Sequence, residues 1–147
     1  MPERLYTIGF TGKSAEAFFE TLRSAGAARL LDVRLKNTSQ LAGFTKRDDL
    51  SYLLRALLGM GYAHLPELAP TEELMSRYKA DKDWEAYARD FAALLAERGV
   101  EITLDLALFE PRAVLLCSEP GAERCHRSLV AAYLKDRLWP DLEIQHL

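Results

Sequence analysis

Ala113-Val114-Leu115-Leu116-Cys117 decides the fold of this chain, because a continuous apolar run of strand length is typical of a central strand that helices cover on both faces. Two further strand-like runs, at residues 5–10 and 29–34, alternate with longer stretches of helical periodicity. This alternation predicts an α/β fold with a single domain over residues 1–147: a three-layer, Rossmann-like arrangement with a mainly parallel sheet of about five strands. The three runs are expected to form the parallel centre of that sheet.

The outer elements are expected from apolar periodicity and from capping residues. They are short strands at 62–65 and 142–144, an ambiguous stretch at 102–109, and helices at 14–25, 45–58, 71 onward, 83–98 and 123–138. Ser14 and Thr71 are expected to cap their helices through the side chain. Thr45 and Asp48 have the spacing of a capping box, and Gly99 is expected to end its helix.

The composition excludes several classes of protein. The chain has 147 residues, of which 49% are hydrophobic and 28% charged, so disordered and fibrous classes are excluded. Its formal charge of −3, from 19 basic and 22 acidic residues, gives no field that would hold nucleic acid without sequence preference. No run approaches the roughly 20 apolar residues of a membrane span, and the chain does not start like a signal peptide. A reducing cytoplasm is therefore the expected location.

The residues that end the central strands are the first candidates for a site, because ligands of open parallel sheets bind beyond the carboxyl ends of the strands. The helix that follows the last central strand begins close to these carboxyl ends. The candidates are Gly9, Phe10, Asp32, Arg34, Cys117, Glu119, His126 and Arg127. We expect one pocket there, floored by Gly9 and Phe10 and lined by Arg34, Glu119, His126 and Arg127.

Several short groups of residues form an ordered set of motifs along the chain. They are Tyr6-Thr7-Ile8-Gly9, Asp32-Val33-Arg34, Pro66-Glu67-Leu68, and Cys117-Ser118-Glu119 with Cys125-His126-Arg127. The set resembles the family called domain of unknown function 488, which implies an α/β fold and no settled reaction. The chain departs from the family pattern at Phe10, where many members carry a histidine, and in residues 35–42, where a proline-containing pattern is replaced. A mechanism that needs that histidine is therefore in doubt.

Cys117 and Cys125 are too few for a secreted disulfide framework. Cys117 ends an apolar run, so it is either a buried structural thiol or a nucleophile. The two thiols are expected to stay reduced and unbridged. A cysteine phosphatase would need an arginine where this chain has Glu123, which disfavours that chemistry. Metal binding by Cys117, Cys125 and His126 is a further alternative, but adjacent helical residues point about 100° apart, so no metal is expected.

Roles for the candidate residues follow from their chemistry. Arginine presents planar donors that suit phosphate or carboxylate, and Asp32 shares a sheet face with Arg34, which allows a structural pair. The expected substrate-binding residues are Arg34, Arg127, Asp32, Gly9, Phe10 and Tyr6. The expected catalytic residues are Glu119, His126 and Cys117, with Glu119 or His126 moving a proton.

Two main classes of function follow from these residues. The first is a hydrolase or transferase that acts on a nucleotide or a nucleic-acid-derived anionic substrate. The second is a non-catalytic nucleotide-binding or nucleic-acid-binding sensor, and a partner-binding scaffold is a third alternative. We expect no cofactor and no membrane partner. The expected ligand is a small anion or nucleotide, and a nucleic acid would have to bind by something other than bulk charge.

Overall fold

The computed structural model describes residues 1–38, 43–118, 121 and 124–147. Its centre is a five-stranded sheet in the order β3-β2-β4-β1-β5, and every strand pair is parallel. The strands are β1 (Arg4–Gly9), β2 (Arg29–Asp32), β3 (Gly61–His64), β4 (Ala113–Cys117) and β5 (Glu143–His146). The predicted parallel sheet is confirmed, and the three strands predicted to be central lie at its centre.

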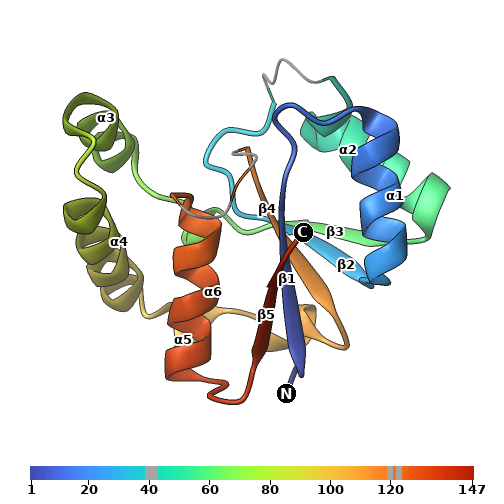
Figure 1. Ribbon diagram of the computed structural model, residues 1–147. Helices are drawn as coiled ribbons and strands as arrows, with labels where there is room; N and C mark the ends of the chain where they lie inside the picture. The colour runs from blue at the N-terminus through green and yellow to red at the C-terminus, as the bar shows by residue number, and fades with distance from the viewer. Residues whose placement is uncertain (39–42, 119–120, 122–123) are drawn as a thin grey trace.

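Helices cover both faces of the sheet, which gives the three predicted layers (Figure 1). The helices are α1 (Ala15–Ala25), α2 (Arg47–Leu53), α3 (Glu72–Asp81), α4 (Trp84–Arg98), α5 (Val100–Thr103) and α6 (His126–Arg137). Helices α1 and α2 lie on one side of the sheet, and α4 to α6 on the other, with α3 beyond the sheet edge (Figure 1). None of the helices in the described part of the chain has both the length and the hydropathy to cross a membrane.

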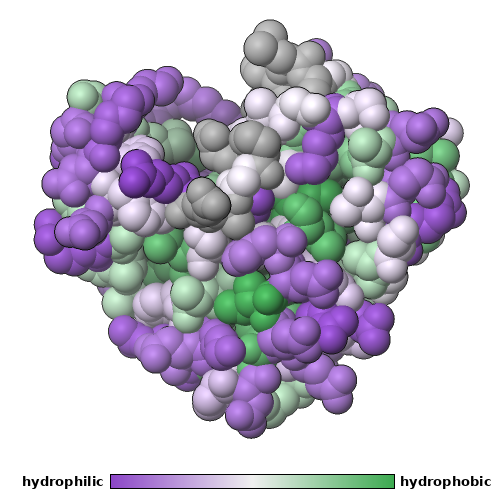
Figure 2. Space-filling view, in the orientation of Figure 1, coloured by the Kyte–Doolittle hydropathy of each residue, from purple (hydrophilic) through white to green (hydrophobic). Residues whose placement is uncertain are grey.

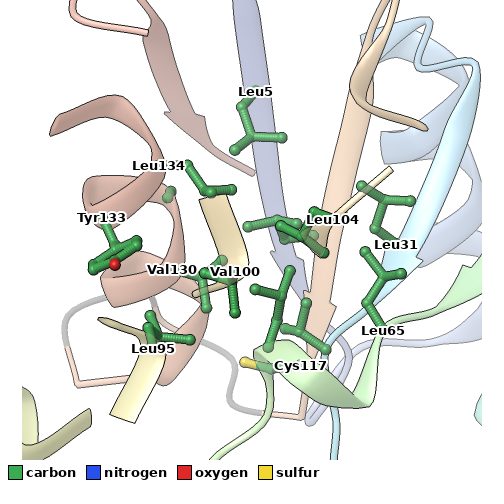
Figure 3. Close-up of a cluster of buried hydrophobic side chains, with 14 of the residues drawn as sticks. Leu5, Leu31, Leu65, Leu95, Val100, Leu104, Cys117, Val130, Tyr133 and Leu134 are labelled. Atoms are coloured by element: carbon green, nitrogen blue, oxygen red, sulfur yellow. The ribbon is translucent and has the colours of Figure 1, made fainter. Parts of the chain in front are cut away.

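Alternate residues of each central strand face two separate cores. On β4, Leu115 and Cys117 belong to the core under α4 and α6, whereas Val114 and Leu116 belong to the core under α1 and α2. Figure 3 shows the first of these cores, with Cys117 at its edge. All five residues of β4 are buried, as the apolar run predicts.

Most predicted helix ends are confirmed, and two starts are wrong. Ser14 and Thr71 each accept a hydrogen bond from the backbone N–H three residues later, over 3.1 Å. Thr45 does not cap a helix: it is fully buried in a 3-10 turn, and Lys46 precedes α2 without a side-chain cap. Helix α6 begins at His126, three residues later than predicted. The ambiguous stretch at 102–109 contains the end of α5 and a 3-10 turn.

Candidate functional site

A cavity of about 760 Å³ opens at the carboxyl edge of the sheet, between α3 and the start of α6. Its base contains Cys117 and Ser118 from the end of β4, and Cys125 and His126 from the start of α6. Basic and aromatic side chains form much of the rest. The full lining is Lys36, Glu72, Met75, Ser76, Tyr78, Lys79, Lys82, Tyr87, Cys117, Ser118, Arg124, Cys125 and His126. The surface over α3, at the upper left of Figure 2, is largely hydrophilic.

Cys117 and Cys125 are joined in a disulfide, with their Cα atoms 7.6 Å apart. The prediction that they stay unbridged is therefore wrong. Cys125 does not point away as a helical residue would, because it precedes α6 in an extended conformation, with φ −130° and ψ 141°. The start of α6 lies beside the end of β4, which brings the two buried side chains together.

Arg127 connects the first turn of α6 to the sheet. The residue is 1% exposed, and its guanidinium donates from Nε to Thr7 Oγ1 over 3.2 Å and from Nη1 to Cys117 Sγ over 3.1 Å. Thr7 Oγ1 also lies 2.6 Å from His146 Nδ1. A buried guanidinium that donates to sulfur favours the ionised thiolate whenever that thiol is reduced.

His126 is held in one orientation at the base of the cavity. Its Nε2 lies 2.7 Å from the carbonyl oxygen of Val33, at the end of β2, and its ring contacts Phe91 edge to face. Burial lowers the pKa of His126 to about 4; the Val33 hydrogen bond opposes this effect, and the smaller effect of the Arg127 charge adds to it. His126 is therefore a neutral imidazole at pH 7, and because a carbonyl only accepts, Nε2 carries the ring proton.

Asp32 and Arg34 form a buried ion pair on the opposite face of the sheet. Arg34 donates to the two carboxylate oxygens of Asp32 from Nε and Nη2, both over 2.8 Å, which confirms the structural pair that their spacing allows. Tyr62 and Asn37 also donate to Asp32. Burial raises the pKa of Asp32, but the hydrogen bonds and charge of Arg34 outweigh it and hold that pKa below its usual value. Arg34 Nη1 is buried and has no hydrogen-bond partner among the described residues.

The structure brings some of the predicted site residues together and separates others. Cys117 and His126 line the cavity, whereas Arg34 and Arg127 are buried beneath the edge, on opposite faces of the sheet. Phe10 is buried with the guanidinium of Arg34 5.4 Å from its ring centre. The remaining three candidates are Gly9, whose carbonyl accepts from Lys13; Tyr6, which is buried in the core under α1; and Glu119, which lies outside the described residues.

The cavity also contains residues that the sequence analysis did not select. Lys79 lies in the last turn of α3, and Lys82 is its C-cap, in the left-handed conformation with φ 57°. Tyr78 packs against both Tyr87, at 4.9 Å between ring centroids, and Trp84, at 5.7 Å. The one sequence signal for these residues is the basic and aromatic end of α3, which is not next to any strand end along the chain.

Two more basic groups lie close to Arg127. Burial and the charge of Arg127 lower the pKa of Lys13, which donates to the Gly9 carbonyl over 2.6 Å. The same two causes lower the pKa of His146. Lys13 and Arg127 thus place two cationic side chains near the carboxyl ends of β1 and β4, in a chain whose net charge is negative, and His146 beside them is held neutral.

Comparison with known proteins gives a family without an assigned activity. No curated protein and no solved structure matches the chain. The family model described as "Domain of unknown function DUF488" matches residues 14–134, which include the Asp32-Val33-Arg34 and Cys125-His126-Arg127 motifs. Since the match covers well over half of the sequence, this chain belongs to the DUF488 family.

Proposed function

We propose that this chain binds a nucleotide or a nucleic-acid-derived anion in the cavity at the carboxyl edge and acts on it as a hydrolase or transferase. The observation that carries the proposal is the charge of the lining. Four of the lining residues, Lys36, Lys79, Lys82 and Arg124, are basic, and Glu72 is the acidic one among those described. In a chain with a net charge of −3, this local excess attracts an anion without making the whole surface basic.

The aromatic residues of the cavity support a ligand that carries a base. Tyr78 and Tyr87 both contribute to the lining, and their rings form one cluster with Trp84. Base–aromatic stacking contributes about 1–3 kcal/mol per base and tolerates any base, because each has a π face. A phosphate held by the lysines and a base held by the tyrosines would together define a nucleotide rather than a bare inorganic anion.

Reactive groups at the base of the cavity support an enzyme. In the reduced chain, Cys117 is a thiol that accepts a hydrogen bond from Arg127, and His126 is a neutral imidazole with a fixed orientation. A nucleophile and a proton carrier in one cavity suit hydrolysis or group transfer. The second candidate is a sensor that uses the same lining without turnover, which the lysines and tyrosines support equally well.

Calorimetric titration with nucleoside monophosphates tests the binding step. We expect the Lys79→Ala/Lys82→Ala double variant to weaken binding at least about tenfold, which corresponds to about 1.4 kcal/mol. The matched control is Lys46→Ala, because Lys46 is exposed and precedes α2 on the other side of the sheet. The unphosphorylated nucleosides should bind more weakly than their phosphates. Equal affinities for the double variant and for the control would contradict the proposal.

Turnover separates the two candidate functions. If the chain is an enzyme, Cys117→Ser or His126→Gln should abolish conversion of the bound nucleotide while calorimetry still detects binding. If it is a sensor, the reduced wild-type protein should return the nucleotide unchanged at every enzyme concentration. Chromatography of the reaction mixture measures both outcomes.

A further inference from the structure

Three soft metal ligands meet at the base of the cavity. Cys117 Sγ, Cys125 Sγ and a ring nitrogen of His126 all lie within 4.8 Å of one another. Tetrahedral zinc, with Zn–S bonds of about 2.3 Å and Zn–N bonds of about 2.0 Å, holds its ligand atoms roughly 3.5–3.8 Å apart. We propose that the reduced protein binds one Zn²⁺ ion through Cys117, Cys125 and His126.

The hydrogen bond of His126 leaves the correct nitrogen for a metal. Because the Val33 carbonyl can only accept, the proton lies on Nε2 and the lone pair of Nδ1 is available as a ligand. Histidines that bind metals in proteins usually donate their other ring N–H to a carbonyl or carboxylate, which fixes the ring. Val33, at the end of β2, supplies that outer contact before any ion binds.

Arg127 supplies a second outer contact. Its Nη1 donates to Cys117 Sγ over 3.1 Å from a buried position. Two thiolates and one Zn²⁺ sum to no net charge, so the ion balances the sulfur charge and the guanidinium orients one thiolate. This arrangement allows a cation to bind next to Arg127.

The spacing of the two cysteines is compatible with a bridging ion. Their Cα atoms are 7.6 Å apart, whereas most disulfides have Cα atoms 4.4–6.8 Å apart. The disulfide and the metal site are alternative states of the same two residues. A phosphine reductant converts the disulfide to two thiols by taking up the oxygen of one water molecule, and Zn²⁺ then displaces the two thiol protons.

The proposed site has an open position. Cys117, Cys125 and His126 all line the cavity, so an ion bound to them would face it on its fourth side. Three protein ligands and one open position are typical of catalytic zinc sites, whereas structural sites have four. Zinc binding does not depend on the nucleotide function, because it can be measured with no nucleotide present.

Metal titration of the phosphine-reduced protein tests the inference. We expect one Zn²⁺ per chain, measured by competition with a chromophoric chelator and by elemental analysis after desalting. Co²⁺ should bind in place of Zn²⁺ and give thiolate-to-cobalt charge-transfer absorption together with the visible bands of tetrahedral cobalt. The cobalt spectrum is recorded on the wild-type protein, so it does not depend on whether any variant folds.

Variants identify the ligands. His126→Ala and Cys125→Ser should each weaken Zn²⁺ binding at least about hundredfold, since even outer contacts are worth 10-fold to 100-fold in metal affinity. The matched control is His64→Ala, because His64 Nε2 also lies 2.8 Å from a backbone carbonyl, that of Arg34, but belongs to no metal-ligand cluster among the described residues. Reduced wild-type protein that takes up no ion overturns the proposal. So does a cobalt complex without thiolate absorption, or an equal loss of affinity in His64→Ala.

Discussion

Arg127 Nη1 donates a hydrogen bond to Cys117 Sγ over 3.1 Å, and this contact joins the first turn of α6 to the end of β4. Arg127 is 1% exposed, so water does not screen the interaction strongly. Two residues that are ten positions apart in the sequence therefore form a single unit at the base of the cavity. The chemistry of Cys117 is set by this neighbour rather than by solvent.

The contact predicts unequal reactivity of the two cysteines. In protein that has been reduced and treated with a chelator, iodoacetamide should modify Cys117 before Cys125, because Arg127 stabilises the Cys117 thiolate. Arg127→Met should slow the modification of Cys117 at least about tenfold, as measured by mass spectrometry of the peptides. Arg98→Met is the matched control. Arg98 lies at the C-terminal end of α4 and donates to the backbone carbonyls of Glu67 and Ala69. Unchanged rates in Arg127→Met would show that this guanidinium does not activate the thiol.

The buried pair of Asp32 and Arg34 predicts a large effect on stability. Arg34→Ala leaves the Asp32 carboxylate buried without its counter-charge, which typically costs about 3–5 kcal/mol. The same change at Arg47, whose partner Asp48 is exposed, should cost less than about 1 kcal/mol. Urea unfolding at pH 7 measures both. A small loss in Arg34→Ala would mean that water or another residue replaces the guanidinium.

The three central parallel strands and the layers of helices could be predicted because local signals and burial agree. The run at 113–117 is apolar at every position, and the structure buries every position on a strand between two parallel neighbours. Ser14, Thr71 and Gly99 act through hydrogen bonds within a few residues, so the sequence alone locates them. The prediction that Thr45 caps a helix is wrong because this residue is completely buried in the turn before α2, which outweighs its capping-box spacing.

The site could be predicted only where it depends on strand ends. Cys117 and His126 lie where a parallel sheet brings a strand end and a helix start together, and both line the cavity. Arg34 and Arg127 point to opposite faces of the sheet. The alternation of side chains along β2 sets the direction of Arg34, whereas the first turn of α6 sets that of Arg127. Lys79 and Lys82 reach the cavity only through the packing of α3 against α4, which no periodicity in the sequence encodes.

The core under α4 predicts a large packing effect at Phe91. This side chain is fully buried and contacts both Tyr87 and the ring of His126. Phe91→Ala should reduce the free energy of unfolding by about 3–5 kcal/mol, through lost contacts and the cavity left behind. Leu57→Ala, at a position 47% exposed, should change it by less than about 1 kcal/mol. A loss below 1 kcal/mol for Phe91→Ala would show that this helix face does not support the core.

The neutral state of His126 predicts a loss of stability in mild acid. Burial is the main cause of the neutral state, and it lowers the pKa of His126 from 6.5 to about 4. At pH values between 4 and 6.5, the unfolded chain therefore binds a proton that the folded chain does not. Stability therefore falls as the pH drops through this window, by about 2 kcal/mol between pH 7.5 and pH 5. Urea unfolding of reduced, chelator-treated protein at both pH values measures the loss.

The variant His126→Gln isolates this contribution. Glutamine can still donate an N–H to the Val33 carbonyl, but it does not titrate. The variant should be less stable than the wild type at pH 7.5, because a flexible amide replaces a packed ring, and the difference should shrink by about 2 kcal/mol at pH 5, where the wild type loses the stability that depends on a neutral imidazole. Carboxylates titrate in both proteins and cancel in the comparison. A difference that stays constant with pH would mean that His126 takes up its proton in the folded state as readily as in the unfolded chain, and that burial does not hold it neutral.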